Sequence, residues 1–284
     1  MTQASGVDGR LVLVTGASSG IGLAAARQLA RQGARLVLAC RDPERGELAR
    51  RAVAAEARHE PRLLLVDVSD QDALHAAARE FRAQHDRLDV LLNNAGIWSS
   101  KRRLSRQGIE LTWATNVLGY SLLTELLLEP LRAARGRVVC VASRLARGLD
   151  LDDVQFERRP YEGLAAYAQS KQANRLWSWG LARRLDGSGV TVHALHPGGV
   201  NTGIFGKGGG LKGWLGAAYM RFQGRTPDEG ADTAVWLCGA LEAGARSGVF
   251  WVNRRESACE FRDTATEDRL EEICRRLAPV RAQA

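Results

Sequence analysis

Short apolar runs alternate with longer amphipathic stretches along most of this 284-residue chain. The runs are rich in Leu and Val, which is typical of strands buried on both faces of a sheet. The stretches between them carry apolar side chains on one face and charged side chains on the other, as helices do. The pattern predicts strands at 11–14, 35–40, 62–66, 88–92, 137–142, 190–195 and 248–252. It predicts helices at 23–30, 43–58, 70–84, 108–134, 164–185, 227–241 and 264–278.

The order of these elements predicts the fold. A strand followed by a helix, repeated about six times and closed by a last strand, is typical of a parallel sheet covered on both faces. We therefore predict an α/β protein with a single doubly wound parallel sheet of about seven strands, the Rossmann fold. No linker or repeat divides the sequence, so residues 1–284 are expected to form one domain, with a glycine-rich insertion at about 203–224. Ligands of such folds bind beyond the carboxyl ends of the strands.

Polar residues mark the start of two predicted helices. Ser69 stands three residues before Asp72, a spacing close to a capping box, so Ser69 is expected to cap the helix that follows. Thr226 precedes Pro227, and proline is favoured in the first helical turn, so Thr226 is expected to cap the next helix.

Composition changes this picture little. The net charge of +8 raises the alternative of a nucleic-acid-binding surface. Only four of the 40 basic residues are lysines, however, and the arginines are spread through almost every segment, so we interpret the charge as a compositional bias and expect no nucleic-acid partner. The five cysteines lack metal-ligand or paired spacing, so we expect no metal site, reduced thiols and a cytoplasmic protein. The N-terminus is polar, and no apolar run reaches the ~18 residues of a membrane span.

A glycine-rich turn joins the first strand to the first helix. Its spacing is Gly16-x-x-x-Gly20-x-Gly22. Glycine allows a tight turn and close approach of a ligand, and the helix N-terminus that follows offers free N–H groups to a phosphate. Many glycine-rich turns bind nothing, but the position between a strand and a helix favours a dinucleotide. The residues expected to bind it are Gly16, Ser18, Ser19, Gly20, Ile21 and Gly22.

The end of the second strand indicates which dinucleotide. Folds that prefer NAD usually place an acidic residue there to hold the ribose hydroxyls. Here Cys40 takes that position and Arg41 follows. An arginine suits a 2′-phosphate, so we predict NADP (NADPH) as the cofactor and Arg41 as its ligand. The alternative is a solvent-exposed arginine in an arginine-rich protein.

Two further strand ends extend the candidate site. Asp67, with Val68 beside it, is placed to accept from the adenine amino group, or is only a turn residue. The segment Asn94-Ala95-Gly96 offers small residues where a cofactor would lie along the strand ends. The two adjacent asparagines, Asn93 and Asn94, could instead tie neighbouring loops together.

Tyr167 and Lys171 form the candidate chemical centre. Residues four apart lie on one face of a helix, so the Lys171 ammonium is expected beside the Tyr167 phenol. That ammonium, together with an oxidised nicotinamide, would lower the phenol's pKa from ~10 and make Tyr167 a usable general acid and base. Ser143 ends the fifth strand, so its hydroxyl could hold a carbonyl oxygen at the same point, or could merely cap a turn.

Together these motifs resemble the short-chain dehydrogenase/reductase family over about residues 8–253. The resemblance rests on Thr15-Gly16-x-x-x-Gly20-x-Gly22, Asp67, Asn93-Asn94-Ala95-Gly96, Asn116, Ser143, Tyr167-x-x-x-Lys171 and Pro197-Gly198. Ala39-Cys40-Arg41-Asp42 and His196-Pro197-Gly198 resemble the retinol dehydrogenase-like branch. Two departures from the branch weaken the expectation of a retinoid substrate. Ser143-Arg144-Leu145-Ala146 lacks the branch's histidine, and the chain begins almost directly at the first strand.

The resemblance implies a role for each site residue. Tyr167 would donate and accept the proton, and Lys171 would hold the nicotinamide ribose. Ser143 would orient the substrate oxygen, and Asn116 would support a water-linked proton relay to Lys171. Pro197, Gly198, Val200 and Thr202 would contact the cofactor, Thr202 at its carboxamide. Family members often pair through the helices that hold Asn116 and Tyr167, so a homodimer or homotetramer is expected.

We therefore predict an NADP(H)-dependent oxidoreductase that interconverts an aldehyde or ketone and an alcohol. The apolar side chains of 203–224 indicate an apolar small-molecule substrate, although they could instead pack the segment onto the body or form a subunit contact. The interval 144–166 is expected to form another wall of the site, or to turn its charges to water. The alternative function is a non-catalytic dinucleotide-binding regulatory protein on the same fold.

Overall fold

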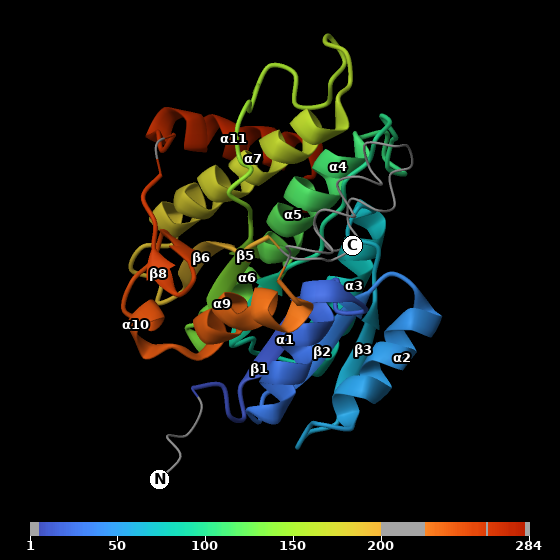
Figure 1. The fold of residues 1–284 in the computed structure, drawn as a ribbon, viewed down its shortest axis with the longest axis vertical. Helices are drawn as coiled ribbons and strands as arrows, with labels where there is room; N and C mark the ends of the chain where they lie inside the picture. The colour runs from blue at the N-terminus through green and yellow to red at the C-terminus, as the bar shows by residue number, and fades with distance from the viewer. Residues whose placement is uncertain (1–5, 200–224, 260, 282–284) are drawn as a thin grey trace.

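The computed structural model describes residues 6–199, 225–259 and 261–281 (Figure 1). Its strands are β1 (Leu11–Thr15), β2 (Arg35–Cys40), β3 (Arg62–Leu65), β4 (Val90–Asn93), β5 (Arg137–Val141), β6 (Thr191–His196), β7 (Val249–Val252) and β8 (Arg255–Glu256). Its α-helices are α1 (Gly20–Arg31), α2 (Pro43–Ala54), α3 (Gln71–Gln84), α4 (Leu111–Trp113), α5 (Gly119–Leu126), α6 (Leu128–Ala134), α7 (Gly163–Arg184), α9 (Pro227–Gly239), α10 (Leu241–Gly244) and α11 (Thr264–Leu277). A π-helical turn, η1 (Ala114–Leu118), joins α4 to α5.

The strands form one sheet in the order β3-β2-β1-β4-β5-β6-β7-β8. The first seven strands run parallel, and β8 pairs antiparallel with β7. The predicted doubly wound parallel sheet is therefore confirmed. The eighth strand was not expected, because two exposed residues carry no apolar pattern. Asn253 and Arg254 connect β7 to β8 with φ of 51° and 59°, the left-handed conformation that a two-residue hairpin turn requires.

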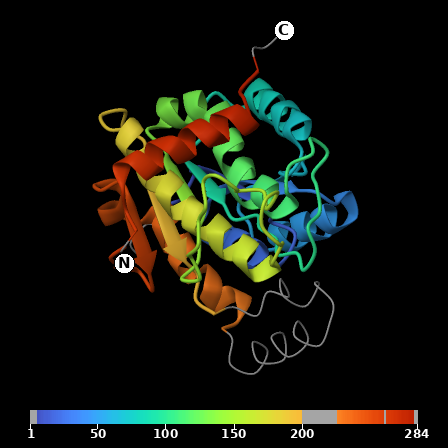
Figure 2. The same cartoon turned by 90° about the horizontal axis from the view of Figure 1, so that it is seen from above.

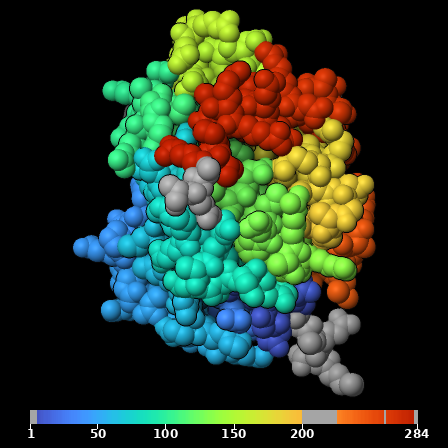
Figure 3. Space-filling view, turned by 180° about the vertical axis from the view of Figure 1, so that it is seen from behind, coloured from blue at the N-terminus to red at the C-terminus, as the bar shows by residue number. Residues whose placement is uncertain are grey.

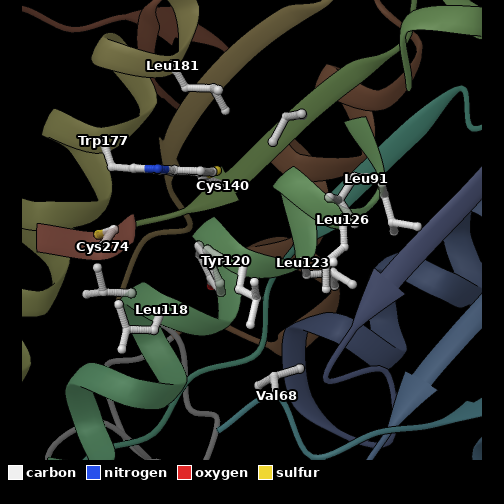
Figure 4. Close-up of a cluster of buried hydrophobic side chains, with 14 of the residues drawn as sticks. Val68, Leu91, Leu118, Tyr120, Leu123, Leu126, Cys140, Trp177, Leu181 and Cys274 are labelled. Carbon is white, nitrogen blue, oxygen red and sulfur yellow. The ribbon is translucent and has the colours of Figure 1, made fainter. Parts of the chain in front are cut away.

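Alternate residues of each strand point to opposite faces of the sheet, and each face has its own core. On β1, Val12 and Val14 face the layer of α1 and α9, whereas Leu11 and Leu13 face the other layer. That second layer contains α3, α5 and α7 (Figure 1). Figure 4 shows part of its core, where Tyr120 of α5 and Trp177 of α7 lie near β5.

Helix α11 adds a further layer on the outer side of α7 and α5 (Figure 2). Its buried stripe includes Leu270, Ile273 and Cys274, which join the same core as α5 and α7. An ion pair between Arg184 of α7 and Glu271 of α11 lies along this contact. The C-terminal end of α11 reaches α3 (Figure 3), where Gln71 Nε2 donates to the carbonyl of Leu277 at 2.8 Å. The C-terminal helix predicted at 264–278 is thus confirmed, and it covers α5 and α7 of the second layer.

Two local predictions require correction, and a third is confirmed. The helix predicted at 108–134 is broken into α4, η1, α5 and α6, and the last break precedes Pro130, which lacks the N–H that would bond back to Leu126. Asp70, not Ser69, caps α3, because its carboxylate is one residue nearer and accepts from two free N–H groups of the first turn. The Ser69 hydroxyl instead donates to Asp67 Oδ1 at 2.7 Å. The cap predicted at Thr226 is confirmed as a full capping box with Glu229.

Three absences hold for the described part of the chain. Its helices include none long and apolar enough to cross a membrane. Within the same ranges, no group of His, Cys, Asp or Glu side chains is arranged to hold a metal ion. All five cysteines are free thiols.

His193 on β6 is fully buried in the neutral form. The indole N–H of Trp251 donates to His193 Nδ1 at 3.1 Å, so that nitrogen carries no proton, and Nε2 lies 2.8 Å from the carbonyl oxygen of Ala243. Burial lowers the pKa of His193 from 6.5 to about 4.

Lowering the pH should therefore destabilise the fold before most of its carboxylates become protonated. Below pH 6.5 the unfolded chain takes up a proton at His193 that the folded chain binds only near pH 4. The free energy of unfolding should fall through this window by up to about 3 kcal/mol for this residue. His193→Gln should reduce the slope of unfolding free energy against pH, measured by urea denaturation. His59→Gln, at an exposed histidine, is the matched control, and an equal slope in both variants would contradict the assignment.

Candidate active site

One cleft lies at the carboxyl ends of the central strands and gathers most of the predicted site residues. The predicted residues that line it are Gly16, Ser18, Ser19, Gly20, Ile21, Arg41, Asp67, Val68, Asn94, Ala95, Gly96, Ser143, Tyr167, Lys171, Pro197 and Gly198. Gly22 and Asn116 lie behind the lining. Val200, Thr202 and the insertion 203–224 lie outside the described residues.

The glycine turn has the tight geometry that its spacing predicts. Gly16 and Gly20 have φ of 67° and 56°, values that favour glycine. A Cβ on Gly22 would lie 2.3 Å from the carbonyl oxygen of Gly16 and 2.5 Å from Asn94 Nδ2. Gly22 therefore serves the close packing of α1 against the turn rather than lining the cleft. The side chain of Ser19, the residue before α1, makes no capping bond to the first turn.

Asn94 ties two strand ends together and also lines the cleft. Its side-chain Nδ2 donates to the carbonyl of Thr15 at 2.8 Å, which ties the end of β4 to the end of β1. The Thr15 hydroxyl in turn accepts from the N–H groups of Asn94 and Ala95 at 2.9 and 3.0 Å. These bonds hold Asn94, Ala95 and Gly96 along the wall of the cleft. Asn93 points elsewhere and donates to Thr124 in the core.

Charged side chains gather at the β2–β3 end of the cleft. The Arg41 side chain is 70% exposed, and its Nη1 lies 3.7 Å from Asp67 Oδ2. Asp67 also accepts from the N–H and hydroxyl of Ser69, so it acts as a turn residue while it lines the cleft. A second arginine, Arg45 at the start of α2, lines the same end. Sequence reasoning missed Arg45, although its spacing of four from Arg41 was a usable signal.

Tyr167 and Lys171 lie on one face of α7 as predicted. The Lys171 ammonium is 5.7 Å from the centroid of the Tyr167 ring and donates to the carbonyl of Val141 at 2.9 Å. Burial raises the pKa of Tyr167 to about 12, although its hydrogen bond with the Ser143 side chain acts in the opposite direction. Burial also lowers the pKa of Lys171 to about 8. The predicted lowering of the tyrosine pKa is thus not produced by the chain alone, because desolvation disfavours both charged forms.

Ser143 and Asn116 differ in how directly they reach the cleft. Ser143 Oγ lines it, bonds with Tyr167, and accepts from the N–H of Leu145 at 3.0 Å. Asn116 sits in η1, fully buried, with Nδ2 donating to the Ile97 carbonyl and to Ser170 Oγ at 3.0 Å each. Among the described residues, the hydrogen bonds of the Asn116 side chain go to Ile97 and Ser170 and not to Lys171. A Cβ on Gly96 would lie 3.4 Å from Asn116 Oδ1 and 3.6 Å from Lys171 Nζ, so both groups lie beside Gly96.

The interval 144–166 contributes little of the cleft among the described residues, only Leu145 near its start. Its acidic residues have structural partners instead. Asp153 is buried and accepts from three backbone N–H groups of its own loop, those of Glu157, Arg158 and Arg159. Neither expectation holds for Asp153, whose carboxylate lines no part of the cleft and is buried from water while it binds its own loop.

Several lining residues were not predicted as site residues. They include Ile97 and Thr115 on one side and Leu145 and His196 on the other. His196 is the most informative, because its Nδ1 accepts the N–H of Arg144 at 3.2 Å, directly after Ser143. It ends β6 next to Pro197 and Gly198, so its position at a strand end could have identified it.

A doubly wound sheet with a glycine turn after β1, and with serine, tyrosine and lysine at the same strand edge, defines a dinucleotide-binding oxidoreductase fold. The chain belongs to the short-chain dehydrogenase/reductase family: a model of the short chain dehydrogenase family matches residues 10–208. Members of this family bind a nicotinamide dinucleotide.

Named relatives and solved structures agree with this assignment. Human retinol dehydrogenase 13 is 35% identical over 281 residues, which cover 95% of this chain and 83% of the relative. Mouse retinol dehydrogenase 11 is 37% identical over 274 residues, covering 95% and 84%. The structure of L-sorbose reductase from Gluconobacter frateurii, complexed with NADPH and L-sorbose, matches with a TM-score of 0.71 at 26% identity, covering 88% of this chain and 96% of the other. The resemblance to the retinol dehydrogenase-like branch is therefore confirmed.

Proposed function

We propose that this chain is an NADP(H)-dependent oxidoreductase that interconverts an aldehyde or ketone and the corresponding alcohol. The observation that carries the proposal is the meeting of Tyr167, Ser143 and Lys171 in one cleft whose far end holds Arg41 and Arg45. The relatives named retinol dehydrogenases support the reaction type.

The cleft fits a dinucleotide. Gly16 allows the turn to pass close to Ala95, whose Cα would lie 2.9 Å from a Cβ at Gly16. Ser19 leaves the N–H groups at the start of α1 without a side-chain cap, as a phosphate site requires. The nicotinamide of the bound cofactor would exchange a hydride with the carbonyl carbon. The residues proposed to hold it are those of the glycine turn, Arg41, Asp67, Val68, Asn94, Ala95, Gly96, Lys171, Pro197 and Gly198, with Val200 and Thr202 beyond the described residues.

The chain's own side chains would move the proton. In reduction, Tyr167 would donate its phenolic proton to the carbonyl oxygen as negative charge develops there. The Ser143 hydroxyl would donate a hydrogen bond to the same oxygen and orient it. The Lys171 ammonium would favour the phenolate that remains, since an opposite charge within a few ångströms stabilises it. Asn116 is proposed to support a relay to Lys171 through the space beside Gly96.

The substrate is proposed to be an apolar small molecule. The test is a panel of carbonyls with NADPH, containing all-trans-retinal, nonanal, benzaldehyde and a hydroxylated sugar ketone such as L-sorbose. Turnover of any member excludes the non-catalytic regulatory protein. A preference for the sugar over the three apolar aldehydes would contradict the apolar class, and no turnover of any member would contradict the proposed activity.

NADPH should bind more tightly than NADH by about tenfold or more, because each charge-assisted contact to the 2′-phosphate contributes roughly 1.5–3 kcal/mol. Arg41→Ala and Arg45→Ala should each lower the affinity for NADPH and leave that for NADH within about twofold, measured by fluorescence titration. Arg51→Ala is the matched control on the exposed side of α2, where Arg51 pairs with Glu47. An unchanged ratio of the two affinities in Arg41→Ala would reject NADP as the preferred cofactor.

Pairing of subunits and the cytoplasmic location stay predictions. Within one chain, α11 already packs against α7 and α5, the helices expected to form the pairing surface. We therefore propose that any homodimer or homotetramer of this protein uses another face or binds over α11.

A further inference from the structure

A buried arginine lies beside the candidate active site on the same helix. Arg175 is only 6% exposed and follows Tyr167 and Lys171 at the same spacing of four along α7. Its guanidinium lies 3.7 Å from the centroid of the Phe250 ring and also contacts the side chain of Cys259. Burial lowers the pKa of Arg175, because removal from water disfavours its charged form. A buried charge of this kind needs specific hydrogen-bond partners to be tolerated.

The principal partner of Arg175 is the backbone of Ser143. Its NH2 group donates to the Ser143 carbonyl oxygen. On the other side of the same peptide bond, the N–H of Arg144 donates to His196 Nδ1 at 3.2 Å. The peptide plane after Ser143 is thus held at its oxygen by α7 and at its nitrogen by β6. Because a peptide is planar, fixing both groups also fixes the backbone orientation of Ser143.

Ser143 needs this support because it lies beyond the end of β5. The strand ends at Val141, and the last ladder-like bond comes from the N–H of Ala142 to the carbonyl of Leu195. From Ser143 onward no strand pairing sets the direction of the side chain. Functional groups on loops depend on neighbouring side chains to hold them in a productive geometry.

We propose that Arg175, together with His196, is a positioning residue that holds Ser143 in its orientation toward Tyr167 and the substrate oxygen. The effect of Arg175 on turnover rests on the proposed oxidoreductase function. The pair of hydrogen bonds that holds the peptide between Ser143 and Arg144, which we call the clamp, does not rest on it. Arg175 acts through the Ser143 peptide, so it is not a catalytic residue. His196 can accept at Nδ1 only when neutral, and burial together with Arg144, Arg175 and Arg225 lowers its pKa to about 4.

The activity test is a double-mutant cycle with NADPH and whichever panel aldehyde the wild type reduces fastest. Arg175→Met keeps the apolar stem and removes the guanidinium. It should lower kcat by about 10- to 100-fold, since displacement of a catalytic group by about 1 Å can cost that much, and leave the Kd for NADPH within about twofold. Arg175→Lys should recover part of kcat. In a Ser143→Ala background, Arg175→Met should change kcat less than about twofold, because the positioned hydroxyl is gone.

Hydrogen exchange tests the clamp without turnover. In Arg175→Met the amides of Arg144 and Leu145 should exchange at least about tenfold faster, while those of β5 stay unchanged. Unchanged exchange in 143–147 would overturn the clamp, and an equal loss of kcat in both backgrounds would overturn the role through Ser143. If the wild type reduces no carbonyl, the proposed function fails, and the exchange data still decide whether Arg175 holds the peptide. If Arg175→Met does not fold, the exchange of the amides in 143–147 is compared between Arg175→Lys and the wild type instead.

Discussion

Tyr167→Phe should lower kcat by about 10²–10⁴-fold, the usual contribution of general acid catalysis. The substitution keeps the aromatic ring, which is buried, and removes the hydroxyl that we propose protonates the substrate oxygen. Affinity for NADPH should change less than about twofold, because the hydroxyl's hydrogen bond goes to the Ser143 side chain, which we propose holds the substrate oxygen. Steady-state kinetics in the reductive direction and a cofactor titration measure the two effects separately.

Tyr161→Phe provides a matched control for this experiment. Tyr161 is also partly buried, and burial likewise raises its pKa to about 12. Its hydroxyl bonds to the Ser99 carbonyl and to Glu110, outside the lining of the cleft. Tyr161→Phe should therefore change thermal stability more than kcat. If the folded Tyr167→Phe protein keeps more than about a tenth of wild-type kcat, the proton comes from another group.

Much of the sheet could be predicted because its strands are apolar on both faces. Arg35–Cys40 was predicted with its observed bounds, since a continuous apolar run between polar turns leaves little choice. The helix around Asn116 was predicted as one piece, because its apolar residues keep a helical period through the π-helical turn. The break before Pro130 follows from one missing N–H, a local effect that the period of the pattern does not report.

The residues of the candidate site were predictable where they end a strand. Ser143 and Asn94 sit at such ends, so the topology alone brings them to the same edge. Partners joined only by the tertiary fold were not predictable in the same way. The bond between Arg175 and the Ser143 carbonyl spans 32 residues and depends on how α7 packs against the end of β5. The sequence pattern around Arg175 shows only a charged residue in a buried helix.

The pKa of Tyr167 illustrates a further limit of sequence reasoning. The spacing to Lys171 correctly predicted a neighbouring ammonium, and a neighbouring cation lowers a phenol's pKa. Burial acts in the opposite direction, and its size depends on how completely the ring is enclosed. In the folded chain burial raises the pKa by more than the hydrogen bond with the Ser143 side chain lowers it, so the sign of the shift could not be read from the spacing to Lys171.

Lys171→Met should lower the rate of alcohol oxidation near pH 8 by about 10²-fold and also weaken NADPH binding. At a separation near the 5.7 Å between ammonium and ring centroid, the attraction to a phenolate is roughly 2–3 kcal/mol at an effective dielectric constant of about 20, or about two pKa units. Methionine fills a similar volume but provides no charge. Affinity for NADPH should fall because the proposed contact of the ammonium with the nicotinamide ribose is lost with it.

The pH profile separates these two losses. Oxidation needs the phenolate, so its rate should rise with pH, in the wild type through an apparent pKa well below 10. Without the ammonium the phenolate loses this attraction, and the rising limb should move up by about two pH units. The measurement is kcat/KM for alcohol oxidation from pH 6 to 10.5, with Lys101→Met at an exposed lysine as the control. A rising limb at the same pH in Lys171→Met and wild type would show that Lys171 binds the cofactor without tuning Tyr167.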